Sequence, residues 1–587
     1  MAVSEGARGG SRRAVATLVL LPLVVYGLAF ALLTHPLLAR FSTHYFADDG
    51  DGLQNVWNLW WVNKALTELH QSPWYTPYLH YPRGTPLLGH TLNPFNGLVA
   101  IPLLRVLSLV ETHNAIVVGA FVTGGLTAFW LAYRVTGSVA GSLIGGFVYT
   151  FSNYHFAHAQ GHLQLVSLEW IPLFLLCWRA FLGGPTPVIA LAAAATLFLV
   201  ILCDYYYFFY CVIAALLLAA WYTARARDPL ALLRPPFRIP LAVFLVAALL
   251  TSGALAVALV VANLRDPLTG SHPTTDLSLD LLAPLIPGGH WRFRDWTRFY
   301  WWELPGTIHE SSVHLGLAVL GMLVFVWRRR RAIGAAEPGP WFLLMAVFGV
   351  LSLGPVLHVG GRSIGGAVLP YAWLERLVPP LELSGVPVRM MVMVTLAAGV
   401  LCAAGVRALL AEGSRRRWVL LPWLALLWLE YLPFPIPTTR IAVPAYVEAL
   451  RRAPRREAVL DAPADAERNL YHQIIHEKPL SFGYVARLPE SVVRDGQVKE
   501  ILLRRRRFDV LCDRYGLGYV VLERRKDPLA RVAGARALFE DADVRVYDIG
   551  PCTDPRGRSD AVEEPIEPTP GTPAPEARDG DTTPTRQ

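Results

Sequence analysis

Three carboxylates in one short stretch are the first residues of the chain that could do chemistry. Residues 46–61 read FADDGDGLQNVWNLWW, so Asp48, Asp49 and Asp51 lie directly before an amphipathic, tryptophan-rich run. An ionised carboxylate can act as a general base, taking a proton from an acceptor hydroxyl as that hydroxyl attacks an activated carbon. Acids placed here can also cap the helix that follows, because they complement the positive end of its dipole. Capping would account for one or two of the three acids.

Histidine and arginine residues gather in other polar segments between the apolar runs. The stretch NYHFAHAQGH at 153–162 spaces three histidines by three and four residues, which would align them on one face of a helix. That spacing suits a metal site or, as we prefer, a polar loop beneath aromatic residues. The candidate substrate-binding residues are Asp48, His155, His158, His162, Asp204, His290, Arg292, Arg294 and Arg389. From the sequence alone, none of these residues is assigned as a metal ligand.

The composition of the chain indicates a membrane protein whose helices must position these polar segments. Of its 587 residues, 53% are hydrophobic and 17% are charged, and the mean hydropathy is +0.38. Soluble domains carry about 25% charged residues, and roughly 20 apolar residues in a helix cross a bilayer. We predict a mainly α-helical, polytopic protein with about eleven transmembrane helices. They are expected at 14–39, 114–134, 136–152, 163–182, 187–203, 205–224, 239–262, 312–327, 341–358, 389–411 and 418–433.

Arginine clusters beside the apolar runs predict how the chain is threaded. Positive residues favour the cytoplasmic side, which assigns residues 1–13 to the cytoplasm and the acidic outer loop 40–113 to the opposite side. Residues 94–110 contain an arginine and two prolines, so we expect an interfacial or re-entrant helix, with a twelfth span as the alternative. Because the basic residues lie next to membrane segments, the net charge of +8 does not indicate nucleic-acid binding.

The chain changes character after residue 438. The transmembrane core covers 14–438, and residues 439–550 have the patterning of a small extracytoplasmic α/β domain. EAVLDAP, YVVLERR and VRVYDIG are typical of strands, whereas ADAERNLYHQIIHE and GQVKEILLRRRRFDVL have helical periodicity. Residues 551–587 are expected to be disordered. Cys512 and Cys552 could pair in an oxidising compartment, and the sequence leaves that pairing open.

The acidic motif DDGDGLQNVWNLWW, opening into an amphipathic helix, resembles the first outer loop of the GT-C class of membrane glycosyltransferases. A helical core followed by an outer domain is also similar to that class, which includes oligosaccharyltransferases, protein O-mannosyltransferases and aminoarabinose transferases. The segments YPRGTPL, FSNYHFAHAQGHLQLVSLEWIPL and YHQIIHEKPLSFGYVAR look like those of bacterial proteins placed near the class.

The resemblance implies inverting transfer of a sugar from a polyprenyl-phosphate donor to an extracytoplasmic glycan, lipid or protein. It implies a first-loop aspartate as the base, for which Asp51 is the first choice and Asp49 the second. The spacing of these two acids permits a divalent ion, as in the oligosaccharyltransferases, but the second acidic site that such an ion needs is not apparent in the sequence. The expected location is the inner (plasma) membrane, multi-pass, with the N-terminus cytoplasmic and the C-terminus extracytoplasmic.

Three other classes of membrane protein are also compatible with the sequence. A transporter or flippase for lipid-linked sugars would need ionisable groups along a path and usually has inverted repeats, neither of which is evident. A glycan polymerase or ligase would share the membrane context but rely on outer-face arginine and histidine. A non-catalytic scaffold would display the C-terminal domain, but it gives no reason for acids at the membrane edge.

Overall fold

The computed structural model describes residues 13–270, 274–334, 337–365, 368–378, 381, 385–411, 418–525 and 536–552. The chain is mainly helical, and its contacts divide it into two compact units. The helical unit consists of residues 1–70, 92–257 and 271–441, and the mixed unit consists of residues 71–91, 258–270 and 442–587.

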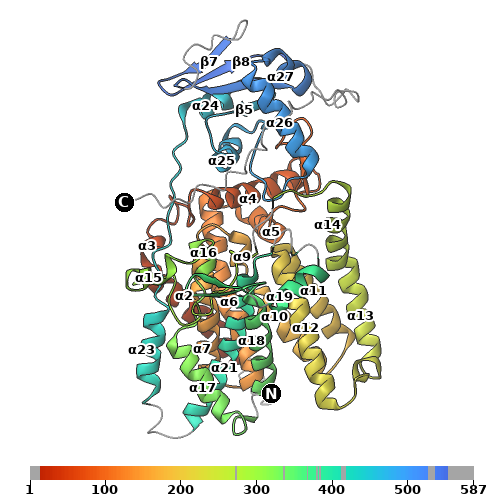
Figure 1. The fold of residues 1–587 in the computed structure, drawn as a ribbon, viewed down its shortest axis with the longest axis vertical. Coiled ribbons are helices and arrows are strands. Elements are labelled where there is room, and N and C mark those ends of the chain that lie inside the picture. The colour runs from red at the N-terminus through yellow and green to blue at the C-terminus, as the bar shows by residue number, and fades with distance from the viewer. Residues whose placement is uncertain are drawn as a thin grey trace, which may run out of the picture. The chain divides into compact units, whose positions relative to one another are not determined.

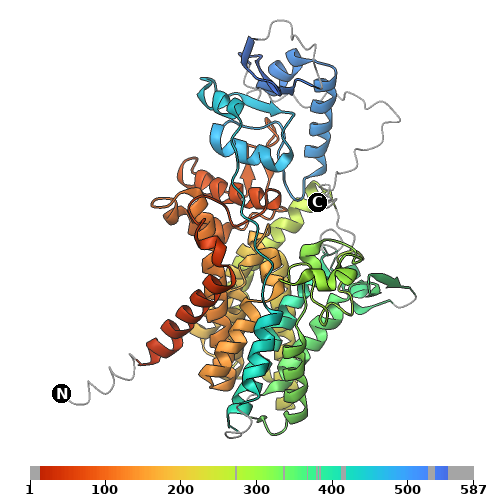
Figure 2. The same ribbon diagram turned by 90° about the vertical axis from the view of Figure 1, so that its left-hand side faces the viewer.

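The helical unit is a bundle whose long helices run alongside one another (Figures 1 and 2). Among the described residues, six helices are long and apolar enough to cross a membrane: Arg13–Leu33, Leu109–Thr136, Leu163–Gly183, Tyr205–Ala226, Arg238–Arg265 and Pro387–Ala411. Shorter apolar helices occupy Pro94–Leu103, Pro187–Cys203, Pro338–Ser352 and Leu420–Glu430. Each predicted span overlaps a helix of the structure. A multi-pass membrane protein is thereby supported, and the count of eleven spans stays a prediction.

The elements of the helical unit follow in chain order. They are η1 (Ala16–Leu20), α2 (Leu21–Leu33), α3 (His35–Leu38), α4 (Asp51–Thr67), α5 (Pro94–Leu103), α6 (Leu109–Thr136), α7 (Val139–Thr150), α8 (Asn153–His158), α9 (Leu163–Val166), α10 (Trp170–Gly183), α11 (Pro187–Cys203), α12 (Tyr205–Ala226), η2 (Ala231–Leu233), α13 (Arg238–Ala248), η3 (Leu249–Gly253), η4 (Arg294–Thr297), α15 (Arg298–Trp301), α16 (Ile308–Ser311), α17 (Leu317–Arg329), α18 (Pro338–Ser352), β3 (Leu357–Val359), β4 (Arg362–Ile364), α19 (Pro370–Leu377), η6 (Pro387–Met390), α21 (Met391–Ala411) and α23 (Leu420–Glu430). Helix α14 (Ala254–Arg265) begins in the helical unit and continues in the mixed unit. Strands β3 and β4 pair antiparallel.

Helix α21 is the most buried long helix of the bundle and packs against α6, α7, α17 and α18. Its approach to α7 depends on glycine: a Cβ on Gly145 would lie 2.7 Å from the Gly399 carbonyl oxygen, and one on Gly399 would lie 2.6 Å from the Gly145 carbonyl oxygen. Small residues let membrane helices pack backbone to backbone. Since η6 leads directly into α21, this tight packing also fixes the position of Arg389.

Helix α4 lies across one end of the bundle instead of along it (Figure 1). It packs against α5 and α6, and its stacked Trp57 and Trp61 are fully buried in protein, with ring centroids 5.7 Å apart. Helix α5 has ten residues, or about 15 Å of helix, which is half of the roughly 30 Å of hydrocarbon in a bilayer. This length favours the interfacial placement predicted for residues 94–110.

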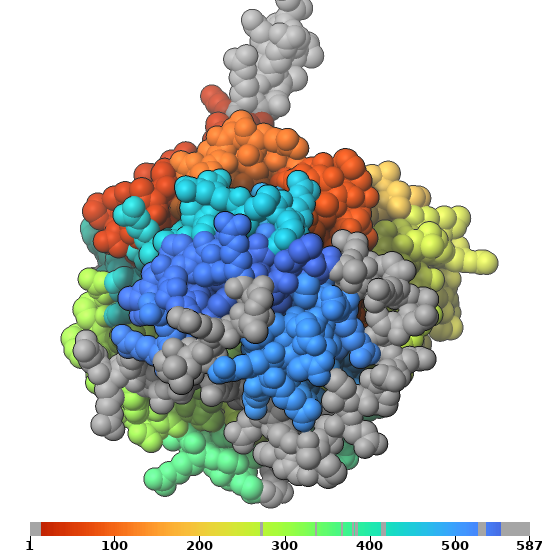
Figure 3. Space-filling model, turned by 90° about the horizontal axis from the view of Figure 1, so that it is seen from above, coloured from red at the N-terminus to blue at the C-terminus, as the bar shows by residue number. Residues whose placement is uncertain are grey.

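The mixed unit is built around a four-stranded sheet in the order β5-β6-β8-β7. Strand β5 (Ala458–Asp461) is parallel to β6 (Leu517–Glu523), whereas β8 (Val544–Asp548) is antiparallel to both β6 and β7 (Arg536–Glu540). Its helices are α24 (Ala445–Arg452), α25 (Ala466–His476), α26 (Glu490–Arg504) and α27 (Phe508–Tyr515), and β1 (Tyr75–Thr76) pairs with β2 (Thr85–Pro86). Seen from above, the later segments of this unit form a continuous surface, coloured blue in Figure 3.

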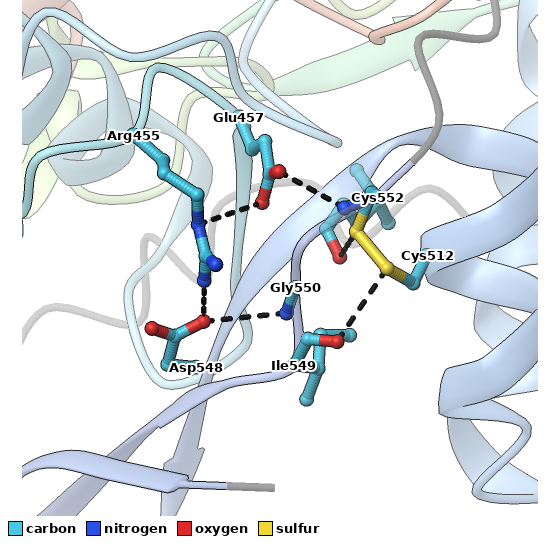
Figure 4. Close-up of a disulfide and its surroundings, with 8 residues drawn as sticks. Arg455, Glu457, Cys512, Asp548, Ile549, Gly550 and Cys552 are labelled. Carbon is cyan, nitrogen blue, oxygen red and sulfur yellow. Dashed lines mark hydrogen bonds and ion pairs between the residues drawn. A yellow bond between two sulfur atoms is a disulfide. The ribbon is translucent and has the colours of Figure 1, made fainter.

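In the mixed unit, a disulfide between Cys512 and Cys552 links α27 to the segment that follows β8 (Figure 4). The Cys512 sulfur lies on α27, and the Cys552 amide donates to Glu457 at 3.0 Å beside Arg455. The pairing that the sequence left open is therefore present. Residues 551 and 552 are described and belong to this structure, whereas the remainder of the predicted disordered tail lies outside the described residues.

Three strands of the sheet coincide with the predicted ones, and two features of the mixed unit were not predicted. Strand β7 has no alternating apolar pattern, since it reads RALFE. The single helix expected over 496–511 is two helices, because α26 ends at Arg504 and Arg506 has a positive φ of 56° before α27 begins. A residue with that backbone conformation cannot continue a right-handed helix.

Candidate active site

Asp51 begins α4 and lies beside His162. The Asp51 Oδ2 atom is 3.2 Å from His162 Nε2, and the aspartate side chain is 42% exposed. Asn55 Nδ2 donates both to the Asp51 carbonyl at 3.0 Å and to the Gly161 carbonyl. These hydrogen bonds join the start of α4 to the loop that carries Gly161 and His162. A Cβ at position 161 would lie 2.8 Å from Asp48 Oδ2 and 3.1 Å from Asp51 Cβ. The two segments therefore approach too closely for any residue larger than glycine at position 161.

The three neighbouring acids occupy three different environments. Asp48 Oδ1 accepts from the Gly50 amide at 3.1 Å and the Gly52 amide at 2.9 Å, so this carboxylate caps the first turn of α4. Asp49 is exposed. Burial, aided by the charge of Asp51, raises the pKa of Asp48 to about 6. The capping interpretation therefore applies to Asp48, while the Asp51 carboxylate faces a histidine.

A chain of polar contacts leads from Asp51 into the protein. His162 Nδ1 is 3.0 Å from His158 Nδ1, and His158 Nε2 is 3.7 Å from Glu310 Oε2. If both ring nitrogens of His162 carry protons, one donates to Asp51 and the other to His158 Nδ1, which leaves the His158 proton on Nε2, facing Glu310. The contacts thus define one consistent arrangement of protons across four side chains.

The electrostatics of the chain favour the same arrangement. Burial alone would raise the pKa of Asp51, but the hydrogen bond and charge of His162 outweigh it and lower that pKa. Burial alone would lower the pKa of His162, and Asp51 raises it instead. Burial and the neighbouring cations lower the pKa of His158 well below its usual range. These shifts favour the ionised form of Asp51, the protonated form of His162 and the neutral form of His158.

Glu310 and Arg389 form a buried ion pair at the inner end of the chain. Arg389 Nε donates to Glu310 Oε1 at 2.9 Å, its Nη2 donates to the same oxygen, and the two side chains are 10% and 6% exposed. The Arg389 guanidinium also lies 5.0 Å from the centre of the Tyr206 ring. Although burial opposes ionisation, Arg389 holds the pKa of Glu310 below its ordinary value. Helix α16 carries Glu310 and packs against α8, which carries His158, and against η6, which carries Arg389. The packing of these three short helices brings the three side chains together.

Two further histidines extend the site. The rings of His309 and His290 are stacked 4.9 Å apart, and the His309 ring is 6.0 Å from that of His162. Gln160 Nε2 donates to His290 Nδ1 at 2.6 Å, which attaches His290 to the loop of the other histidines. Burial lowers the pKa of both His290 and His309. Within the described part of the chain, buried His290 Nε2 and His309 Nδ1 have no hydrogen-bond partner. These neutral rings can each offer a nitrogen to a ligand.

Four other candidate residues make contacts outside this chain of side chains, and their part in substrate binding stays a prediction. His155 places its ring nitrogens 2.7 Å and 2.9 Å from the Thr150 and Val166 carbonyl oxygens. Asp204 caps α12, accepting from the amides of Tyr206 and Tyr207. The other two residues are arginines. Arg294 stacks 3.6 Å from the Phe434 ring centre, and Arg292 is exposed.

The residues present fit a divalent metal ion in a second protonation state, in which His162 is neutral and the ligand nitrogens carry no proton. His158, His162 and Glu310 each offer a ligand atom, and these atoms lie within 4.8 Å of one another. Among the described residues, buried His158 Nε2 and Glu310 Oε2 have no hydrogen-bond partner, so both atoms are available to an ion. Two imidazoles and a carboxylate suit transition metals better than Ca²⁺. This group contains neither Asp49 nor Asp51, the two acids whose spacing suggested an ion in the sequence.

Sequence reasoning missed Glu310 and His309. The available signal was a lone acid, in TIHE, immediately before a predicted span. An ionisable residue at such a depth is costly unless it is paired or functional. Its partner Arg389 lies 79 residues further along the chain, and only the fold brings the two together.

Comparisons with known proteins agree with the architecture. No model of a protein family matches the sequence, and no curated protein matches it. An arabinofuranosyltransferase AftD from Mycobacteria superposes with a TM-score of 0.52 at 14% identity, over 90% of this chain and 41% of that one. The oligosaccharyltransferase AglB from Archaeoglobus fulgidus, in complex with an inhibitory peptide and a dolichol-phosphate, gives 0.45 at 12% identity, over 86% and 69%. ArnT from Cupriavidus metallidurans gives 0.45 at 12% identity, over 88% and 97%.

At these identities the likeness concerns the fold. The AftD superposition covers nine tenths of this chain. The expectation drawn from the acidic first loop and the helical core is thus confirmed at the level of architecture: this chain has the fold of the GT-C membrane glycosyltransferases.

Proposed function

We propose that the chain transfers a sugar from a polyprenyl-phosphate donor to an extracytoplasmic acceptor, with inversion at the anomeric carbon and Asp51 as the base. The observation that carries the proposal is the continuous set of contacts Asp51–His162–His158–Glu310–Arg389, at one end of a membrane-type bundle of GT-C fold. These five residues come from four separate segments of the chain. If the acids only capped a helix, the segment that contains Asp51 would be sufficient.

Asp51 has the properties that a general base needs. Its carboxylate is partly exposed, ionised at neutral pH and held by His162 on one oxygen, Oδ2. The other oxygen can accept the proton of an acceptor hydroxyl while that hydroxyl oxygen attacks the anomeric carbon. The bond from that carbon to the phosphate oxygen then breaks, and polyprenyl phosphate leaves with the electron pair. A single displacement of this kind inverts the configuration.

The basic side chains of the site supply partners for the donor phosphate. Arg389 has five N–H donors, of which Nε and one on Nη2 are directed at Glu310, so the others remain for phosphate oxygens. His290 and His309 present buried nitrogens without partners. Phosphate recognition by such groups is favourable because charge-assisted hydrogen bonds are the strong ones.

A divalent ion held by His158, His162 and Glu310 would supply further positive charge for the developing phosphate. Independently of any ion, Glu310 fixes the Arg389 guanidinium, and His162 orients the Asp51 carboxylate. Loss of transfer on dialysis against a chelator, restored by one added metal, would establish that such an ion takes part. Unchanged activity after complete removal of metal would exclude it.

The proposed orientation places the acidic loop and the C-terminal residues outside the cytoplasm, in the plasma membrane. The Cys512–Cys552 disulfide supports this side, since disulfides persist in oxidising compartments. Cysteines engineered at positions 50 and 465 should both react with an impermeant thiol reagent in intact spheroplasts. Protection of either position would contradict the threading.

Replacement of Asp51 tests the catalytic role. The structure assigns capping of α4 to Asp48, so Asp51→Asn and Asp51→Ala should both leave the protein folded and abolish transfer. The expected loss is roughly 10²–10⁴-fold, the usual contribution of a general base. Asp49→Asn is the matched control and should retain activity, because that neighbouring acid is exposed. Turnover by purified Asp51→Asn at the wild-type rate, with lipid-linked donor, would refute the assignment.

A further inference from the structure

Three large aromatic side chains are exposed on one short segment of the helical unit. Over η4 and α15, Trp296, Phe299 and Trp302 are 69%, 76% and 48% exposed. They follow one another at intervals of three residues, so they lie on one face of the segment. Exposed apolar residues normally occur singly, and a contiguous set indicates an interaction surface. We refer to these three residues as the aromatic face.

The rest of the segment is firmly attached to the protein. Tyr300 and Trp301 are buried; the Tyr300 hydroxyl donates to Asp280 at 2.9 Å, and Trp301 Nε1 donates to the Arg294 carbonyl at 2.8 Å. Buried Tyr300 and Trp301 thus hold the segment against the protein, while the aromatic face points away from it. The aromatic face is therefore exposed although the segment itself is held in place.

Contacts with α23 set the position of the segment relative to the bilayer. Helix α23 exposes apolar side chains to its surroundings, namely Leu421, Leu426, Trp428 and Leu429. At its C-terminal end, Trp291 Nε1 donates to the Leu429 carbonyl at 3.0 Å, and the Arg292 amide donates to the Leu432 carbonyl at 2.9 Å. The segment therefore starts where the exposed apolar face of α23 ends, as a segment at a membrane–water interface would.

The composition of the segment suits that depth. Tryptophan is enriched where hydrocarbon meets headgroups, and arginine interacts there with lipid phosphates. Arg292 and Arg298 are exposed beside the aromatic face, and the Arg298 guanidinium lies 4.8 Å from the Trp302 ring centre. We propose that residues 291–302 form an interfacial anchor whose aromatic face enters the phospholipid headgroup layer of the same membrane.

The anchor is directly joined to the candidate active site. His290 precedes Trp291; its carbonyl accepts from the Phe434 amide at 2.7 Å, and its ring stacks on His309. Holding the anchor in the headgroup layer therefore holds His290 at the depth where a lipid-linked phosphate arrives. The anchor itself is independent of the proposed reaction and can be tested without any sugar donor.

Depth measurements with nitroxide labels test the proposal in the full-length chain. Half-buried Cys177 is replaced by alanine; the other free cysteines are buried, and the disulfide is kept. Single labels are placed at 296, 299 and 302, with the protein in nanodiscs of phosphatidylethanolamine and phosphatidylglycerol. A label at the adjacent exposed Asp295 is the matched control. A label at Leu250, 71% exposed on the apolar surface of η3, marks lipid, and one at Glu500 on α26 marks water.

Labels on the aromatic face should collide with oxygen more often than with a water-soluble nickel chelate, giving depths between the Leu250 and Glu500 references. The Asp295 label should be shallower. Labels at 296, 299 and 302 that respond as the Glu500 label does would overturn the proposal. On the unaltered chain, hydroxyl radicals should oxidise Trp296 and Trp302 less than Tyr75, which is 43% exposed in the mixed unit. Oxidation of all three residues to the same extent would also contradict an interfacial position.

Discussion

Removing the negative member of the buried pair Glu310–Arg389 should destabilise the helical unit strongly. Glu310→Gln keeps the shape of the side chain but leaves a guanidinium, 10% exposed, without its counter-charge. Arginine cannot lose its proton in a protein, so the charge must stay. Breaking a buried ion pair by deleting one partner costs about 3–5 kcal/mol. The nearby Tyr206 ring, 5.0 Å from the guanidinium, offsets only a part of this, roughly 1 kcal/mol.

The same reasoning applies to Arg389→Gln. Because the guanidinium is buried against Glu310, this substitution should lower stability as well as weaken donor binding. The double variant Glu310→Gln/Arg389→Gln should be more stable than the sum of the two single losses predicts, by about 1–3 kcal/mol, because it removes both charges.

Thermal unfolding in detergent can be followed through the buried thiols Cys203, Cys211 and Cys402, which react with a maleimide dye as they become exposed. The control residue is Glu337, which lies directly before α18 and pairs at 3.5 Å with both Arg179 of α10 and Arg225 of α12. Its side chain is 40% exposed, and those of the two arginines are 29% and 61% exposed. Glu337→Gln should therefore cost less than about 1 kcal/mol.

Two outcomes would refute the reasoning about the buried pair. The first is a loss of stability in Glu310→Gln no larger than that in Glu337→Gln. The second is a double variant whose loss equals the sum of the single losses, because residues in direct contact should be coupled. Transfer by the double variant at the wild-type rate would retain the stability argument and remove the pair from the active site.

Two further predictions concern the mixed unit. Replacing Cys512 and Cys552 by serine should destabilise it by about 4 kcal/mol, the loop-closure estimate for a 40-residue separation, and make it sensitive to protease at lower temperature; equal sensitivity with and without the disulfide would contradict this. Burial lowers the pKa of His80 and of His476 to about 3. In the unfolded chain each of these histidines binds a proton near pH 6.5, whereas in the folded chain it stays neutral until a much lower pH. The free energy of unfolding is therefore highest above pH 6.5. It falls by up to about 2.7 kcal/mol per pH unit as the pH drops toward 4. His476→Gln should halve that slope in denaturant titrations at pH 7 and 5, and unchanged slopes would contradict the prediction.

The helices of the core could be predicted because their apolar runs are long and bounded by charged or capping residues. The run at 187–203 coincides with α11, and Asp204 ends it by capping the next helix. Such signals are local and survive in a single sequence. The gathering of acids and histidines at one end of the bundle was predictable for the same reason, since consecutive spans alternate in direction.

The contacts within the site could not be predicted, because they join residues far apart in sequence. Asp51 and His162 are brought together by the close approach at Gly161, and nothing local announces that pairing. Arg294, a candidate substrate-binding residue, stacks on Phe434, a partner 140 residues away that no local pattern indicates, and its part in binding stays a prediction. Side chains of one chemical type can serve either role, and packing decides between them.

The division of labour among the three acids explains why the chain has more than one. A helix start needs a side chain that accepts backbone amides, and Asp48 fulfils that need by binding the Gly50 and Gly52 amides. Once that requirement is met, Asp51 can point away from its own helix toward His162, keep a partly exposed carboxylate, and remain ionised. With a single acid the helix start and the proton acceptor would compete for one carboxylate. Asp48→Ala should therefore weaken the start of α4 and reduce transfer indirectly, whereas Asp51→Ala should leave α4 intact and remove the base itself.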